Sequence, residues 1–271
     1  MLGGRHRDVL CTSRCTSDNE TCCRGHTPRC DLAEFAVVSR VHGGPLMQPF
    51  QTSLGDLAAA NPAATRVFMR HRLDFCCGGR QPLGVACERA GLDPAEIAAE
   101  IELETQRDTG QAQEVRWEDR SQGELADHIE RHYHEGVRRD LPSLIEAARK
   151  VERVHAQKPA VPAGLADTLV ALLAEMQSHM QKEERMLFPL LRRGFRGEQV
   201  YMPVRMMESE HDTHGEQLVK IRELTDDLRA PAHACSTWRA LYHGLASFEN
   251  DLMQHIHLEN NVLFARATRG A

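Results

Sequence analysis

Two pairs of histidine and glutamate, each with its residues four apart, are the strongest chemical signal in the sequence. His179 and Glu183 lie in SHMQKEERMLFPLL, and His255 and Glu259 lie in MQHIHLENNVLF. Residues four apart share one face of an α-helix, so each pair can present an imidazole and a carboxylate to the same ion. One such pair is common on a charged helix. Two pairs, each followed by an apolar run, indicate a shared metal site.

Two further segments with a helical pattern carry histidines that could complete this site. The candidates are His128, His132 and His134 in ADHIERHYHEG, and His211 and His214 in MESEHDTHG. The intervals from His134 through His179 and His211 to His255 are 45, 32 and 44 residues, each about one helix plus its connection. In an antiparallel bundle, residues spaced in this way converge on one layer of the core. Spacing alone leaves the choice within each segment open.

Imidazole and carboxylate together suit divalent iron, and two glutamates can bridge a pair of metal ions. Burying this set without metal would leave polar groups unpaired, at a cost of roughly 1–3 kcal/mol each. Glu208 and His211 have the ExxH spacing of ferritin-like sites, but that class needs a second ExxH on a matching helix, and the sequence has none. The remaining histidines are expected at the surface or around the site rather than as ligands: His128, His132, His155, His214, His243 and His257.

The elements that must position these residues are predicted to be helices. Aromatic residues make up only 5% of the chain and charged residues 27%, which favours helices over a β-sandwich. Four long helical patterns cover about 121–157, with a break near Leu141 and Pro142, and then 163–193, 198–229 and 236–266. Glycines and prolines punctuate them. They predict an up-down-up-down four-helix bundle over residues 121–271.

Four shorter helical patterns precede the bundle, within residues 47–107. Asn61 followed by Pro62 marks a helix restart, and Asp93 followed by Pro94 marks a capped helix start. The segment 108–120 is polar and rich in turn residues, so we interpret it as a linker. The sequence therefore predicts a small helical N-terminal domain joined to the bundle.

Adjacent cysteines, Cys76 and Cys77, lie in a loop of this small domain and are followed by Gly78 and Gly79. Neighbouring cysteines are poorly placed for a strain-free mutual disulfide. The glycines permit positive φ and close backbone approach, so the thiols could face a metal or a partner. A tight turn with incidental cysteines explains the same residues equally well.

Five of the nine cysteines fall within the first 30 residues. Residues 1–46 show no sustained apolar period and are interpreted as disordered or as a non-native extension, because Met47 opens the first stretch that looks folded. The alternative is a zinc site that uses Cys11, Cys15, Cys22 and Cys30, but paired CxxC motifs are missing.

The bulk properties exclude several classes of function. The net charge of -6, with basic and acidic residues interspersed, argues against nucleic-acid binding. No apolar run is long enough for a membrane span, and no secretory signal is visible, so we expect a cytoplasmic protein. In that compartment Cys76, Cys77, Cys87 and Cys235 should be reduced thiols.

Residues 50–268 closely resemble the RIC family, the hemerythrin-like di-iron proteins that repair iron-sulfur clusters. The motifs that carry the resemblance are DFCCGG at 74–79, KVERVHAQKP at 150–159, SHMQKEE at 178–184, MESEHD at 207–212 and DLMQHIHLENNVLF at 251–264. The resemblance implies a hemerythrin-like bundle preceded by a small domain with vicinal cysteines. It also implies a Glu-bridged centre of two iron ions with these ligands: His134, His179, Glu183, His211, His255 and Glu259.

The resemblance further implies a function in stress. The expected activity is repair of clusters damaged by oxidative and nitrosative stress, through iron donation, nitric-oxide handling or both, with Cys76 and Cys77 transferring iron or electrons. Damaged iron-sulfur proteins and nitric oxide or oxygen are the expected partners. The alternatives are a gas-binding hemerythrin-like module, a nitric oxide reductase or an iron store. Whether the protein is an enzyme, and whether it forms a homodimer, stay open.

Overall fold

The computed structural model describes residues 50–107 and 116–269. Over these residues the chain forms helices and loops, with one isolated β-bridge between Ser53 and Pro82. The prediction of an all-α protein is confirmed. None of the described helices combines the length and the hydropathy that a bilayer span requires. The predictions for residues 1–46 and for most of the linker lie outside the described residues.

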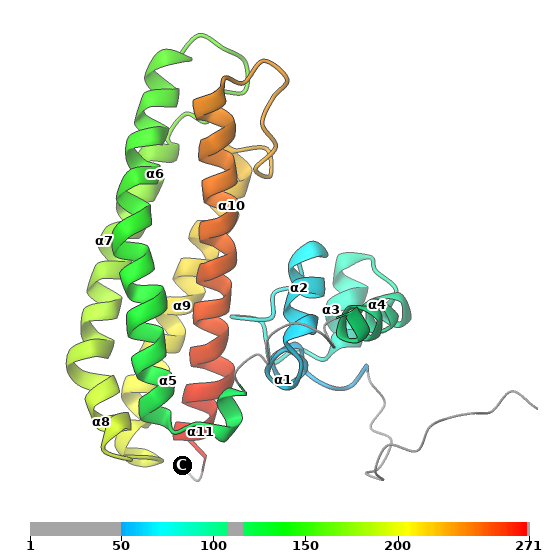
Figure 1. The fold of residues 1–271 in the computed structure, drawn as a ribbon, viewed down its shortest axis with the longest axis vertical. Helices are drawn as coiled ribbons and strands as arrows, with labels where there is room; N and C mark the ends of the chain where they lie inside the picture. The colour runs from blue at the N-terminus through cyan, green and yellow to red at the C-terminus, as the bar shows by residue number, and fades with distance from the viewer. Residues whose placement is uncertain (1–49, 108–115, 270–271) are drawn as a thin grey trace, which may run out of the picture. The chain divides into compact units, whose positions relative to one another are not determined.

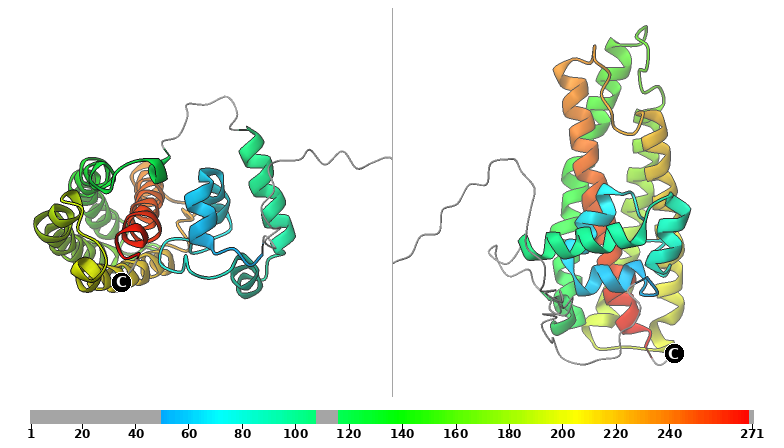
Figure 2. Two further views of the ribbon diagram at one scale, coloured as in Figure 1. Left: turned by 90° about the horizontal axis from the view of Figure 1, so that it is seen from below. Right: turned by 90° about the vertical axis from the view of Figure 1, so that its right-hand side faces the viewer.

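Four rods build the bundle, and three of them contain a π-helical turn. The first rod joins α5 (Gln122–Ile129), the π turn η2 (Glu130–His134) and α6 (Glu135–Val154). The second joins α7 (Leu165–Lys182), η3 (Glu183–Leu187) and α8 (Phe188–Arg192), and the third is α9 (Glu198–Leu224). The fourth joins α10 (Ser236–His257), η4 (Leu258–Phe264) and α11 (Ala265–Ala267). The rods run alternately up and down (Figure 1) and pack side by side (Figure 2), which confirms the predicted bundle.

The ends of the first rod follow local rules, but its middle departs from our prediction. Ser121 caps α5: its Oγ accepts from the Glu124 N–H at 3.1 Å, and its own N–H donates to Glu124 Oε2 at 2.9 Å. The predicted break near Pro142 is wrong, because α6 continues through this residue. Pro142 removes one backbone donor, but buried Leu141 and Ile145 on either side keep the helix packed.

Four short helices precede the bundle: α1 (Leu54–Ala60), α2 (Pro62–Arg70), α3 (Leu83–Ala90) and α4 (Pro94–Arg107). Asn61 starts α2, where its side chain accepts from the Ala63 N–H at 3.0 Å, and Asp93 Oδ1 accepts from the Ala95 N–H at 2.8 Å. Both predicted helix starts are therefore confirmed. Residues 46–271 form one compact unit, so the division into two domains at 108–120 stays a prediction.

Two apolar clusters fill the core of this unit. The first joins the short helices to one half of the bundle and includes Phe75, Leu141, Met176 and Trp238. The second fills the opposite end of the bundle and includes Ile129, Phe188, Val204 and Phe264. Along each rod, the predicted metal ligands fall where the residues of the first cluster give way to those of the second. A polar layer thus separates two apolar cores.

Candidate metal centre

The six residues predicted as ligands come together in this polar layer, and none exposes more than 1% of its surface: His134, His179, Glu183, His211, His255 and Glu259. The alternatives in the first rod are placed elsewhere. His128 is half-buried and stacks on exposed His132, with ring centroids 5.3 Å apart. Burial therefore favours His134, in agreement with the family resemblance.

The six side chains divide into two groups that share both glutamates. One group contains His134 and His255, the other contains His179 and His211, and the donor atoms of each group lie within 4.8 Å of one another. Glu259 serves both groups with different oxygens, because Oε1 lies 3.0 Å from His255 Nε2 and Oε2 lies 3.1 Å from His211 Nε2. This is the arrangement expected of a carboxylate that bridges two metal ions.

Glu183 joins the same two groups from the opposite rod. Its Oε2 lies 3.4 Å from His134 Nε2 and 3.3 Å from His179 Nε2. The Nε2 atoms of His179 and His211 lie only 3.0 Å apart. Two imidazole nitrogens at this distance need a proton or a cation between them, because their lone pairs repel.

The π turns coincide with the donor residues. His134 ends η2, Glu183 begins η3 and Glu259 is the second residue of η4. A π turn inserts one extra residue into a helix and rotates the following side chains relative to the preceding ones. Such turns are rare and occur often at functional sites. Three of them in one layer of the bundle indicate that the rods are adjusted locally to direct these side chains inward.

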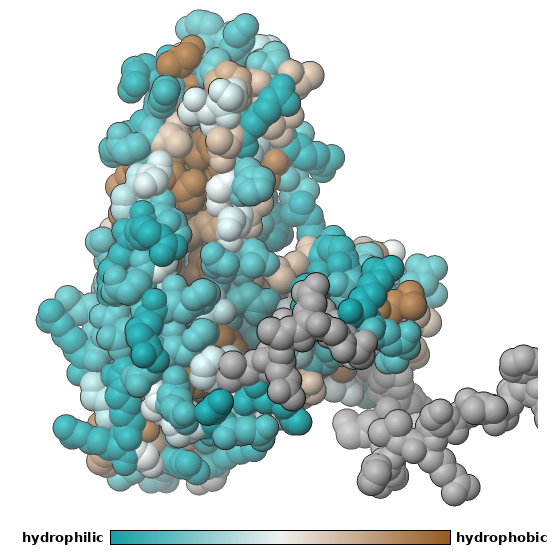
Figure 3. All heavy atoms as spheres, in the orientation of Figure 1, coloured by the Kyte–Doolittle hydropathy of each residue, from teal (hydrophilic) through white to brown (hydrophobic). Residues whose placement is uncertain are grey.

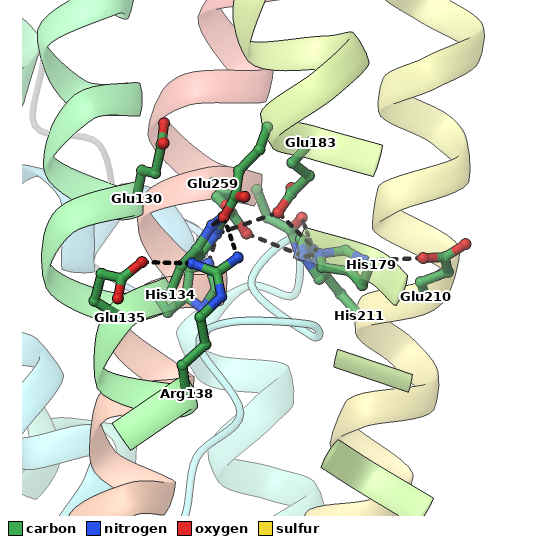
Figure 4. A network of polar contacts seen from close by, with 12 residues as sticks. Glu130, His134, Glu135, Arg138, His179, Glu183, Glu210, His211 and Glu259 are labelled. Carbon is green, nitrogen blue, oxygen red and sulfur yellow. Dashed lines mark hydrogen bonds and ion pairs between the residues drawn. The ribbon is translucent and has the colours of Figure 1, made fainter. Parts of the chain in front are cut away.

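Polar partners outside the layer fix the orientation of three imidazoles, and Figure 4 shows one of these partners, Glu210 beside His179. The Nδ1–H of His134 donates to Glu184 at 2.7 Å, and that of His179 donates to Glu210 at 2.9 Å. The Nδ1–H of His211 donates to the Asn260 side-chain oxygen at 2.8 Å. Each bond leaves Nε2 as the nitrogen that can bind metal, as is usual for histidine ligands.

The fourth imidazole, that of His255, is oriented by packing. Its ring stacks on Tyr133 with centroids 5.4 Å apart and planes within 5°. Arg138 and Lys182 lie outside the layer and bind the carboxylates of Glu184 and Glu210 at 2.6 and 2.5 Å. The histidine partners are therefore themselves held in place.

Unpaired buried atoms show that the layer suits a cation. His134 Nε2, both oxygens of Glu183 and Glu259 Oε2 are buried without a hydrogen bond among the described residues. Native proteins rarely leave such atoms unsatisfied, since each costs about 1–3 kcal/mol. Metal coordination would satisfy them all, so the donors present fit a centre for two ions.

The electrostatic field of the layer favours positive charge. Burial lowers the pKa of His134 and His179, but the nearby carboxylates outweigh it and raise each pKa to about 10. The pKa of Glu259 falls well below its ordinary value, because the surrounding histidines outweigh the effect of burial. A field that holds protons on His134 and His179 also attracts a metal cation, whereas burial outweighs it at His255 and lowers the pKa of that imidazole.

Two of the histidines that the sequence analysis expected at the surface or around the site, His214 and His257, are buried near this layer. The His214 ring lies 4.9 Å from that of His179, and burial with the neighbouring histidines lowers its pKa to about 3. Burial lowers the pKa of His257 to about 4. Both stay neutral at pH 7 and add no charge to the layer. Ile256 and Leu258 beside His257 were an available signal for its burial, whereas the polar neighbours of His214 gave none.

The vicinal cysteines belong to residues 74–79, which we name the thiol turn. Asp74 Oδ1 accepts from the N–H groups of Cys76 and Cys77 at 3.2 and 2.9 Å and from the Cys76 thiol at 3.3 Å. The two sulfur atoms are 3.8 Å apart. The hydrogen bond with Cys77, burial and the charge of Asp74 raise the pKa of Cys76 well above its ordinary value.

Three hydrogen bonds connect the thiol turn to the metal layer and its surroundings. The Cys77 thiol donates to the backbone oxygen of His211 at 3.3 Å. The Asn260 amide, whose oxygen binds His211, donates to the backbone oxygen of Cys76 at 3.2 Å. The neighbouring Asn261 donates to the backbone oxygen of Phe75 at 3.0 Å. The thiol turn is thus attached to the residues that hold the centre.

Gly79 is required because the surrounding atoms pack closely against it. It is not required for a positive φ, because neither Gly78 nor Gly79 adopts one. A Cβ at Gly79 would lie 2.6 Å from the Phe75 oxygen and 2.7 Å from the Asn261 side-chain oxygen. We expect Gly79→Ala to lower the free energy of unfolding by about 1–3 kcal/mol, as measured by urea denaturation of the metal-free protein.

Gly123 in α5 provides the matched control for this prediction. Its added Cβ would meet Arg192 at an ordinary 3.6 Å, so Gly123→Ala should stabilise the helix by about 0.5–1 kcal/mol. Equal effects of the two substitutions would contradict the tight contact at Gly79.

The fold and the buried layer together define a hemerythrin-like metal-binding protein. Residues 125–267 match the hemerythrin HHE cation binding domain, and residues 50–105 match a domain of unknown function, DUF542. Relatives named iron-sulfur cluster repair protein YtfE, from Yersinia pseudotuberculosis serotype IB (strain PB1/+) and Yersinia pestis (strain Pestoides F), are each 47% identical over 219 residues. The match covers 80% of this chain and 97% of each relative. The chain belongs to the RIC family of iron-sulfur cluster repair proteins.

Proposed function

We propose that this protein repairs iron-sulfur clusters damaged by oxidative and nitrosative stress, and that it donates iron from a centre of two ions. The ligands in this proposal are His134, His179, Glu183, His211, His255 and Glu259. The observation that carries the proposal is the bond from the Cys77 thiol to the backbone of His211. A bundle that only binds gas has no use for a thiol pair at this position.

The residues of the layer have distinct tasks in this function. Glu183 and Glu259 would bridge the ions and neutralise part of their charge, while Glu184 and Glu210 hold two imidazoles with Nε2 facing inward. The bound iron would supply exchangeable Fe²⁺ and one-electron chemistry. Buried histidines of low pKa, such as His214, exclude water and a further positive charge.

The thiols lie between the layer and the surface. Cys76 and Cys77 line a cavity of about 570 Å³ whose wall also includes exposed Asp212 and Glu216. Iron is the cargo in this proposal, and thiolates bind it more strongly than water does. We propose damaged iron-sulfur proteins as recipients and the cytoplasm as the compartment, in agreement with the free thiols of the described cysteines.

A second candidate function is the binding or reduction of nitric oxide, and a separate groove favours it. A cavity of about 370 Å³ between α6 and α10 reaches His255. Its wall includes Val137, Leu144 and Phe248, and Figure 3 shows a hydrophobic stripe along this part of the bundle. The wall mixes these apolar residues with charged ones, and its apolar part offers a small uncharged gas a route towards His255. Tyr133 stands at its inner end, with its pKa raised to about 12 by burial, and so keeps its proton.

Replacement of both Cys76 and Cys77 by serine tests the main proposal. Serine has nearly the same shape as cysteine but binds iron weakly, so the iron content of the bundle should stay unchanged. The rate at which a nitric-oxide-damaged iron-sulfur enzyme regains activity should fall to the rate without the protein. The matched control replaces Cys87 and Cys235, which lie outside the thiol turn. Unchanged rates in the Cys76 and Cys77 variant would refute the proposed transfer.

A further inference from the structure

The thiol turn has the geometry of a metal site in its own right. Its two sulfur atoms are 3.8 Å apart, and Asp74 Oδ1 lies 3.3 Å from the Cys76 sulfur. A tetrahedral ion with bonds of about 2.3 Å to sulfur and about 2.0–2.2 Å to oxygen holds two sulfurs about 3.8 Å apart and a sulfur and an oxygen about 3.5 Å apart. Two of the three distances between donor atoms therefore match such a tetrahedron before any ion binds, and all three donor atoms lie within 4.8 Å of one another.

The thiol turn maintains this spacing through its backbone. Asp74 accepts from the N–H groups of both cysteines, so the carboxylate and the thiols are held on one side of a tight turn. Asn260 and Asn261 hold the carbonyl groups of Cys76 and Phe75 from the bundle. A preorganised set of donors loses little conformational entropy when it binds an ion.

The surroundings leave room for a fourth ligand. All three donor residues line the cavity of about 570 Å³, together with the carboxylates of Asp212 and Glu216. On α9, Gly215 leaves space beside the thiols, because it has no side chain and an added Cβ would lie 3.4 Å from the Cys77 sulfur. Three protein donors with an open fourth position are typical of sites that exchange ligands, whereas structural sites are closed.

We propose that Asp74, Cys76 and Cys77 form a second metal site, which binds one soft divalent cation separately from the histidine and glutamate centre. Binding replaces the two S–H protons, which leave to solvent, with two metal–sulfur bonds, and no electron is transferred. The role of this site in binding iron during its transfer from the bundle to a recipient protein rests on the proposed function. The binding itself does not.

Cobalt is a suitable probe, because Co²⁺ bound to thiolates absorbs strongly through sulfur-to-metal charge transfer. The titration uses the full chain, loaded with iron, in which the five cysteines of residues 1–49 are replaced by serine to remove their background. We expect one equivalent of Co²⁺ to bind with charge-transfer absorption and the visible bands of a tetrahedral site. Iron content and circular dichroism, measured on the same samples, report that the bundle is intact.

Three variants separate this site from other thiols. Serine at both Cys76 and Cys77 should abolish the cobalt absorption, and serine at both Cys87 and Cys235 should leave it unchanged. Asp74→Asn keeps an oxygen for the turn but removes the charge, so the affinity for Co²⁺ should fall at least about tenfold. Cobalt absorption that persists without Cys76 and Cys77, or an Asp74→Asn affinity equal to that of the parent, would overturn the proposal.

The cobalt titration and a cluster-repair assay test two separate proposals, the metal site at the thiol turn and the function of the protein. Cobalt binding at the thiol turn in a protein that fails to restore clusters would support the site and refute cluster repair. Restoration of clusters by a protein that binds no cobalt there would refute the site and leave cluster repair standing.

Discussion

Glu259→Gln should empty both halves of the metal centre. Each oxygen of this carboxylate lies against a different group of histidines, at 3.0 Å from His255 and 3.1 Å from His211. Removal of a hydrogen-bond partner of a ligand typically costs about 10–100-fold in metal affinity, and removal of a shared ligand should cost each ion more. We expect the iron content to fall from two ions per chain towards none, as measured by metal analysis and Mössbauer spectroscopy.

The matched control is Glu175→Gln in α7. Glu175 lies one turn before His179 but is exposed, so its replacement should leave the iron content unchanged. Glu183→Gln should behave like Glu259→Gln, because Glu183 also lies between both groups. A Glu259→Gln protein that retains two ions with an unchanged Mössbauer spectrum would show that this carboxylate does not bridge.

Asn260→Leu should disturb the metal layer and the thiol turn together. The Asn260 amide accepts from His211 at 2.8 Å and donates to the Cys76 carbonyl at 3.2 Å. Leucine has a similar volume but makes neither bond, so His211 loses the group that orients its Nε2. We expect a loss of about 10–100-fold in iron affinity and faster alkylation of Cys77, as measured by iron competition with a chelator and by mass spectrometry.

Asn260→Asp separates the two effects, because a carboxylate can still accept from His211 but cannot donate to Cys76. Iron affinity should recover while Cys77 stays more reactive than in the parent. His243→Leu is the control on the same rod, since His243 is exposed, lies further from the layer along α10 and does not line the cavity of the thiols. If Asn260→Leu changed iron affinity and left Cys77 reactivity at the parent level, the connection between the two sites would be refuted.

Periodicity and spacing predicted the bundle and four of the proposed ligands well, because both depend on local sequence. His179 with Glu183 and His255 with Glu259 follow from the helical repeat alone. The choice of His134 over His128 needed the family resemblance, because spacing alone left both candidates open and the π turn at 130–134 shifts the helical register between them. The predicted break at Pro142 was wrong for a related reason. The rule that proline interrupts a helix is local, whereas the packing of the bundle keeps α6 continuous at this residue.

The supporting residues were harder to predict, because their partners lie far away in the chain. Glu184 approaches His134 across 50 residues, and Asn260 approaches Cys76 across 184. A charged or amide side chain on a helix is usually exposed, so the residue type alone does not indicate a partner far away in the chain. Only the assembled bundle reveals which polar residues surround the layer.

The position of the polar layer between two apolar clusters bears on what happens to the fold when iron leaves. Each cluster is packed by its own apolar side chains and contains none of the proposed metal ligands. Loss of iron should therefore loosen the layer while both clusters stay folded, as in proteins that open locally rather than globally. If the protein donates iron as proposed, we expect that such a chain is discharged and recharged many times rather than consumed in a single delivery.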